Sequence, residues 1–252
     1  MRDTPVTERA TPVLRAYRAT DRDAVRDICC RTAFRNVGAR AVLDDPELFG
    51  DYWTAYYTDH EPESITIAEH EGVAIGYLTG CANTRRYIRI MARRVVPSVL
   101  ARLAWRASCG RYRGQPRARA FMRWMARQSW REAPPVDIDR FPAHYHANIL
   151  REGSGHGLYS AMALGFLDAM QARGVSGVHG QVIDYRERGA WERFVAEFFV
   201  EHPGAPIESW ERECTLGRDV LGVKRALMNR AWGAPIDVFR QFLETIARRH
   251  GL

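Results

Sequence analysis

The stretch FPAHYHANILREGSGHGLYSAMALGFLDAMQARG, residues Phe141–Gly174, decides the fold. Its first ten residues, Phe141–Leu150, alternate well enough to predict a strand. After the turn Gly153–Gly157, apolar residues recur at helical spacing up to the stop signal Gly174. A strand that leads through a glycine-rich turn into a helix gathers free backbone N–H groups at the positive end of the helix dipole. The stretch therefore predicts an anion site, most often one for phosphate.

Two common phosphate-binding motifs do not fit this turn. The dinucleotide fingerprint needs a glycine three residues after Gly155, where the chain has Leu158. A Walker A loop needs Gly-Lys-Ser/Thr, and the only lysine of the chain is Lys224. The turn therefore belongs to another class of phosphate site, or it is a glycine-rich entry into a core helix.

A second pattern lies about 60 residues upstream. Ser64–Glu69 and Val73–Gly80 predict two strands joined by a tight turn, with the pattern I-A-E-x-x-G-x-x-I-G-Y-L-x-G. This hairpin resembles strands two and three of the GCN5-related N-acetyltransferases (the GNAT superfamily). The turn Ser154–Tyr159 resembles motif A of the same superfamily, with Gly157 and Gly155 in register. Two separate matches thus indicate one family.

The resemblance implies an α/β fold, the acyl-CoA N-acyltransferase (GNAT) fold. We expect a mixed, mostly antiparallel sheet of about seven strands, with helices on both faces. The domain is expected at residues 12–252, after a disordered lead-in at 1–11, with an Arg-rich helical insertion at about 84–135 and a C-terminal helix at about 235–250. The last two strands are predicted at Ile207–Cys214 and Val220–Met228.

The resemblance also implies acetyl-CoA as acyl donor and assigns residues to it. The pyrophosphate is expected at Ser154, Gly155, His156, Gly157, Leu158 and Tyr159. The backbone N–H that stabilises the developing oxyanion is expected around Ile149 and Leu150, where the fourth strand diverges from its neighbour.

Three positions depart from the family pattern. Ser154 stands where Arg or Gln is usual, and Tyr159 stands where a small residue is usual. Phe194 stands where motif B carries the tyrosine that acts as general acid. A phenyl ring donates no proton. Either the thiolate leaves unaided, or another group such as Tyr159 or Tyr185 donates, or the protein is a catalytically impaired relative that binds CoA.

His144 and His146 are the candidate catalytic residues. They lie two apart on a predicted strand and so project to the same face, and histidine titrates near neutrality. Three interpretations stand: a general base or substrate contact, structural histidines, or a metal pair. H-x-H is a metal-ligand spacing, but the sequence offers no convincing third ligand, so no metal is predicted. Asp184 and His179, on the next strand, can orient the pair or bind the amine.

Composition sets broad limits. The chain has 252 residues, 46% of them hydrophobic, and no run approaches 18 consecutive apolar residues, so we expect no membrane span. The polar N-terminus does not resemble a signal peptide. Five cysteines without C-x-x-C spacing favour reduced thiols and a cytoplasmic location.

The segment Thr84–Arg131 contains 14 arginines and no acidic residue, whereas the net charge of the whole chain is only +7. We expect two amphipathic helices there, broken by Pro97 and by Cys109–Pro116. The arginines can form a solvated face, a lid over an acidic ligand, or a surface for an anionic partner. The segment lacks a recognisable reader motif, which argues against nucleic acid as its partner.

The sequence thus predicts acetyl-CoA-dependent N-acetylation of a small-molecule primary amine by direct attack. The H-x-H strand, the insertion and the G-V-x-G-V-H strand resemble bacterial acetyltransferases related to the acetyltransferase-like domain of O-GlcNAcases, which implies an amino sugar or similar amine. The alternatives are a CoA-binding relative and an anionic-surface or nucleic-acid binding module. A homodimer is compatible with the sequence.

Overall fold

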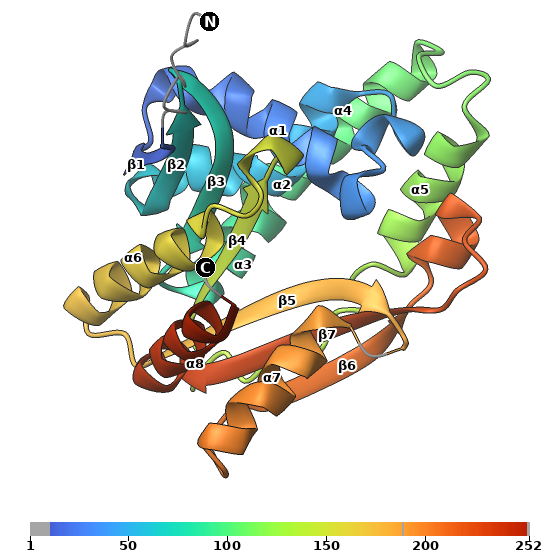
Figure 1. Cartoon of the computed structure of the whole chain (residues 1–252). Helices are drawn as coiled ribbons and strands as arrows, with labels where there is room; N and C mark the ends of the chain where they lie inside the picture. The colour runs from blue at the N-terminus through green and yellow to red at the C-terminus, as the bar shows by residue number, and fades with distance from the viewer. Residues whose placement is uncertain (1–10, 188, 251–252) are drawn as a thin grey trace, which may run out of the picture.

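The computed structural model describes residues 11–187 and 189–250 (Figure 1). Its centre is a mixed seven-stranded sheet in the order β1-β2-β3-β4-β5-β7-β6. Every neighbouring pair is antiparallel except β4 and β5. The strands are Val13–Ala16 (β1), Ile65–His70 (β2), Val73–Cys81 (β3), Ala143–Ile149 (β4), Gly177–Tyr185 (β5), Glu208–Cys214 (β6) and Leu227–Pro235 (β7). The predicted fold class is confirmed. The expected lead-in lies, apart from residue 11, outside the described residues.

Helices cover both faces of the sheet. One face carries α6 (Leu158–Ala172), α7 (Ala190–Glu201) and α8 (Ile236–His250). The other carries α1 (Arg22–Asn36), α2 (Pro46–His60) and the helices that follow β3. Among the described helices, none has the length and apolar character needed to cross a bilayer.

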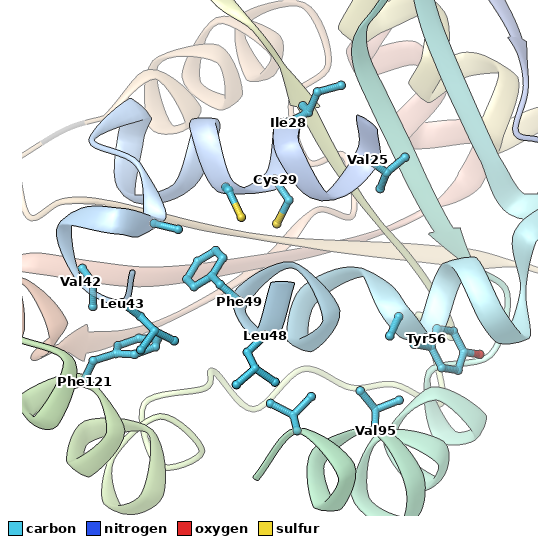
Figure 2. Close-up of a cluster of buried hydrophobic side chains, with 14 of the residues drawn as sticks. Val25, Ile28, Cys29, Val42, Leu43, Leu48, Phe49, Tyr56, Val95 and Phe121 are labelled. Atoms are coloured by element: carbon cyan, nitrogen blue, oxygen red, sulfur yellow. The ribbon is translucent and has the colours of Figure 1, made fainter. Parts of the chain in front are cut away.

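Each face has its own apolar core. On the α6 side, Met162, Phe166 and Phe239 are almost fully buried together with Trp232 of β7. On the α1 side, Ile28 and Leu48 are buried with Val95 and Phe121 from the segment between β3 and β4, as Figure 2 shows. Since that segment supplies buried apolar side chains, it is part of the folded unit.

This segment contains α3 (Thr84–Ile90), a π-helical turn at Met91–Val95, α4 (Val96–Ser108) and α5 (Pro116–Arg127). The expected break at Pro97 was wrong. Pro97 lies in the first turn of α4, where a missing N–H is tolerated, and the preceding π-helical turn joins α3 to α4 without interruption. The expected separation of α4 from α5 is present at Cys109–Gln115.

The last strand also differs from its prediction. Val220–Met228 was expected, but a π-helical turn occupies Gly217–Leu221 and β7 begins only at Leu227. The strand is buried along almost its whole length although it carries Asn229 and Arg230. Arg230 is buried because it donates to the carbonyls of Tyr185 and Arg186. These polar residues interrupt the apolar pattern from which a strand is predicted.

Candidate functional site

The sheet opens between β4 and β5. These parallel strands pair only at Ala143 with Val178 and at His144 with His179, and then diverge. A cavity of about 730 Å³ lies at the divergence and is lined by residues of both cores, Trp232 and Phe242 on one face and Phe49 and Phe121 on the other. The cavity therefore passes through the sheet and connects its two faces.

Unpaired backbone groups border the gap. Leu150 donates its N–H to the carbonyl of Ile75 (2.9 Å), so the prediction of this N–H as an oxyanion donor was wrong. In an antiparallel ladder, every second residue directs its backbone N–H and C=O groups to the same neighbouring strand. Given the register Gly76 with Ile149, the backbone N–H groups of Ala147 and Ile149 turn away from β3 and into the gap. Ile149 therefore stays a predicted donor, and Ala147 joins it.

The glycine-rich turn lies beyond the end of β4. Gly155 (φ 84°) and Gly157 (φ 66°) adopt the left-handed conformation that glycine tolerates best. The first hydrogen bond of α6 is donated by Ala161 to the carbonyl of Gly157. The N–H groups of Leu158, Tyr159 and Ser160 thus precede the helical ladder and are free for an anion.

Ser154 and His156 are both exposed in this turn. The Ser154 N–H donates to the carbonyl of Arg151 (3.1 Å), so this residue can offer only its hydroxyl to a ligand. The turn offers two left-handed glycines and a helix N-terminus, and its role as an anion site stays a prediction.

A tyrosine pair lies on the α6 side of the gap. The hydroxyls of Tyr145 and Tyr159 are 2.8 Å apart, and both residues line the cavity. Burial raises the pKa of Tyr145. Loss of hydration inside the cavity raises that of Tyr159, although 42% of its surface is exposed, so both phenols carry their protons at neutral pH. Phe194 lines the same side of the cavity. Tyr185 lines the cavity from the far end of β5, where the guanidinium groups of Arg35 and Arg225 lie over its ring. The pair is the better placed proton donor.

His144 is held as a neutral imidazole. The Thr84 hydroxyl donates to the carbonyl of Pro142, so its oxygen accepts from Nδ1–H of His144 (2.7 Å). Nε2 then accepts from the Tyr57 hydroxyl (2.9 Å). Burial, with the neighbouring His146 and His179, lowers the pKa of His144 well below its ordinary value. Both nitrogens are engaged, so His144 is a structural group that can neither bind a metal nor abstract a proton directly.

His146 is different although it lies on the same face. Its imidazole lines the cavity, and its packing partners are the rings of Tyr57 and His144. Burial and the neighbouring His179 lower its pKa to about 4, so it is unprotonated at neutral pH. A neutral imidazole facing a cavity can accept a proton. His179 donates Nδ1–H to the carbonyl of Phe141. No group of three or more metal-ligating side chains occurs within the described residues.

Asp184 is not part of the histidine cluster. Its carboxylate pairs with Arg35 and accepts from the N–H of Tyr185 (2.7 Å). It lies at the far end of β5, five residues beyond His179, and next to Gly189. The expectation that it orients the histidines was wrong because Tyr57 and Thr84 do so for His144. Asp184 instead joins β5 to the end of α1 through Arg35, which lines the cavity.

Sequence reasoning missed the residues from distant parts of the chain that orient His144 or line the cavity. Tyr57 of α2 has no signal in the sequence, because its partner is 87 positions away. The aromatic residues of α2 and α5 that line the cavity were not predicted as site residues. Their helical spacing gives no distinction between facing a core and facing a cavity.

The arginines of the insertion are partly structural. Arg102 pairs with Asp51, and Arg106 with Asp45 and Glu47, all three acids on or beside α2. Asp45 and Asp51 are buried, so these cations compensate acids that the fold has removed from water. The insertion is thereby fixed against α2, on the side of the cavity formed by α1 and α2.

No family model matches the sequence. The protein named SsHAT is 27% identical, with a TM-score of 0.59 over 90% of this chain and 98% of that chain. An N-acetyltransferase from Staphylococcus aureus Mu50 is 11% identical, with a TM-score of 0.47 over 90% and 99%. The phosphinothricin acetyltransferase Pat of the GNAT superfamily from Sinorhizobium meliloti, in complex with acetyl-CoA, is 14% identical, with a TM-score of 0.46 over 89% and 88%.

The likeness to SsHAT covers nearly the whole of both chains. The sheet also has two features that the resemblance implied. It is mostly antiparallel with a single parallel pair, and that pair, β4 and β5, diverges after two residues. The chain has the GNAT fold.

Proposed function

We propose that this protein is an N-acetyltransferase that transfers the acetyl group of acetyl-CoA to a small-molecule primary amine by direct attack. One observation carries the proposal: a single cavity crosses the sheet at the β4–β5 gap, beside the glycine-rich turn, with the unprotonated His146 among its lining residues. Donor and acceptor can therefore approach from opposite faces and meet inside the gap.

The residues present fit an acyl-CoA. A pyrophosphate needs N–H donors and a nearby positive dipole, which the turn Gly155–Gly157 and the start of α6 supply. A pantetheine arm contains amides, and the free backbone edge of β4 at Ala147 and Ile149 offers them hydrogen bonds that a buried edge otherwise lacks. The same edge supplies the N–H donors for an oxyanion.

The chemistry balances with the groups at hand. The amine nitrogen forms a bond to the thioester carbonyl carbon, the carbon–sulfur bond breaks, and one amine proton passes to His146. The leaving thiolate takes a proton from the Tyr145–Tyr159 pair or from water. A cysteine route is disfavoured, because burial raises the pKa of Cys29, which also lines the cavity, to about 12 and keeps it as a thiol.

The location, the exact amine and the oligomeric state have fewer observations behind them. A cytoplasmic location is supported by cysteines that are all free. The amino sugar suggested by resemblance is one member of the amine class, and a homodimer stays a prediction.

Calorimetry with acetyl-CoA, followed by a thiol-release assay with amines, tests the proposal. Gly157→Ala should weaken acetyl-CoA binding at least tenfold, because a side chain strains the left-handed residue that begins α6. Gly174→Ala is the matched control: it has φ 72° at the other end of α6 and open space around it, and it should leave binding unchanged. Absence of acetyl-CoA binding by the wild type at high micromolar concentration would refute the proposal. Binding without acetylation of any amine would leave a CoA-binding relative.

A further inference from the structure

The acceptor side of the cavity is walled by a continuous group of aromatic rings. We call this group the aromatic wall. It consists of Phe34 from the end of α1, Phe49 and Trp53 from α2, and Phe121 and Trp124 from α5, all of which line the cavity. Neighbouring ring centroids lie between 5.7 and 6.4 Å apart. Figure 2 shows Phe49 and Phe121 within one cluster contributed by separate helices.

The wall is held from outside the cavity. Trp124 donates its indole N–H towards the Glu132 carboxylate (3.2 Å) and the Thr215 hydroxyl (3.2 Å). Glu132 also accepts from the backbone N–H of Thr215 (3.1 Å), which ties the end of the insertion to the segment after β6. The ring of Trp124 is therefore fixed where it stacks on Phe121.

The cavity offers almost no charge to its ligand. Among the lining residues of the described chain, Arg35 alone is permanently charged, and it is paired with Asp184. None of these lining residues is an aspartate or a glutamate. An ammonium ion placed here would lose its hydration without gaining a counter-ion, which is costly in an apolar surrounding.

Polar groups gather at the floor of the cavity, where β4 and β5 diverge. His146 and Asn148 face it from β4, and Gln181 faces it from β5. Asn148 is engaged by Thr32 and Tyr77, and Gln181 donates to Asn229. An acceptor therefore finds aromatic rings around its body, with His146, Asn148 and Gln181 gathered at the end where acyl transfer is proposed.

We infer that the acceptor is an arylamine, an aromatic ring bearing a primary amino group that is uncharged at neutral pH, with its ring against the aromatic wall and its nitrogen beside His146. This inference rests on the proposed function and names its substrate class. Ring-to-ring packing favours a planar aromatic body over a sugar, whose hydroxyl groups need more hydrogen-bond partners than this wall offers.

The base strength of His146 fits such an acceptor. A pKa of about 4 is too low to hold a proton taken from an alkylammonium ion, whose pKa resembles that of a lysine. The lone pair of an arylamine is delocalised into its ring, so the amine arrives unprotonated. Its nitrogen becomes strongly acidic only after it has attacked the carbonyl carbon, when a weak base suffices.

A matched pair of probes tests the inference. Aniline and cyclohexylamine have similar size, but only cyclohexylamine is an ammonium ion at neutral pH. In a thiol-release assay with saturating acetyl-CoA at pH 7, kcat/KM for aniline should exceed that for cyclohexylamine, glucosamine and spermidine at least tenfold. A higher kcat/KM for any of these three, or no acetylation of aniline by protein that binds acetyl-CoA, overturns the inference. Failure to bind acetyl-CoA instead refutes the proposed function.

Two variants separate specificity from stability. Gln181→Glu introduces a carboxylate at an exposed position of the cavity and should raise the ratio of cyclohexylamine to aniline kcat/KM at least tenfold. Trp124→Leu removes a ring of the wall and should raise KM for aniline about tenfold, with the acetyl-CoA Kd unchanged. Trp105→Leu, an exposed tryptophan on α4 of the same insertion, is the control and should change neither value. An unchanged amine preference in Gln181→Glu contradicts the inference.

Discussion

Asp45→Asn should weaken the attachment of the insertion to α2 at a measurable cost in stability. Asp45 is almost fully buried, and its carboxylate accepts from Arg106 (2.6 Å), from the Tyr112 hydroxyl (2.7 Å) and from the N–H of Leu48 (3.3 Å). Burial alone would raise the pKa of Asp45, but these hydrogen bonds outweigh it and hold the pKa below its usual value. The side chain is therefore charged at neutral pH and joins three parts of the fold.

The magnitude follows from what asparagine keeps and loses. It retains the shape and one acceptor oxygen, so the cap of α2 is weakened only in part. It loses the charge that compensates Arg106, and breaking a buried ion pair from one side costs about 3–5 kcal/mol. Arg106 keeps Glu47 as second partner, which places the expected loss at the low end, about 3 kcal/mol. For a chain of this size, that lowers Tm by roughly 6–12 °C.

Thermal and urea unfolding of Asp45→Asn measure this loss, with Asp44→Asn as the control. Asp44 is the exposed neighbour of Asp45, and its only ion pair is a loose one to Arg40 (3.6 Å) among the described residues. The control should unfold within about 0.5 kcal/mol of the wild type. A loss below about 1 kcal/mol in Asp45→Asn would show that the insertion is not held through this carboxylate.

Three further outcomes follow from the site. His146→Gln should lower kcat about 100-fold with the acetyl-CoA Kd unchanged, measured by thiol release and calorimetry, and a loss below threefold contradicts its role as base. Tyr159→Phe should lower kcat, because Tyr159 lines the cavity. Tyr57 does not line it, so Tyr57→Phe should destabilise the fold without changing the pH profile of kcat. Stability should fall between about pH 6.5 and 4, since the unfolded chain binds a proton at His146 there and the folded chain does not. His146 accounts for at most about 3 kcal/mol of this loss, and the lowered pKa values of His144 and His179 add to it, so urea unfolding of His146→Gln should show a shallower decline that does not vanish.

The two histidines show where sequence reasoning stops. Their spacing correctly predicts a shared face, because a strand alternates its side chains. Their roles are set by partners from other elements: Thr84 and Tyr57 engage both nitrogens of His144, whereas His146 faces the cavity. Nothing in the pattern H-x-H distinguishes the two. Of the interpretations left open for the pair, the contacts of His144 favour a structural role, whereas His146 stays a candidate base.

The same limit explains which strands and helices were predicted correctly and which were misplaced. The hairpin and the stretch from β4 to α6 were predicted well because their signals, alternation and turn glycines, are local. β7 was misplaced because Arg230 and Asn229 are buried by partners on β5 and at Glu132, which no local pattern reveals. Asp184 was placed with the histidines because they share neighbouring strands, whereas its partner Arg35 comes from a left-handed turn at the end of α1.

The two halves of the site differ in how the chain builds them. The proposed donor half uses one continuous stretch, in which β4, the glycine-rich turn and α6 follow each other, so its chemistry could be predicted from spacing. The acceptor half brings together the end of α1, α2 and α5, which are separated by up to about 90 residues. They meet through tertiary contacts, such as the ring contact of Phe49 with Phe121 and the ion pair that fixes Arg106 of α4 to Asp45. Substrate choice therefore depends on tertiary contacts of the insertion, and a change in those contacts can alter the acceptor while the donor site stays the same.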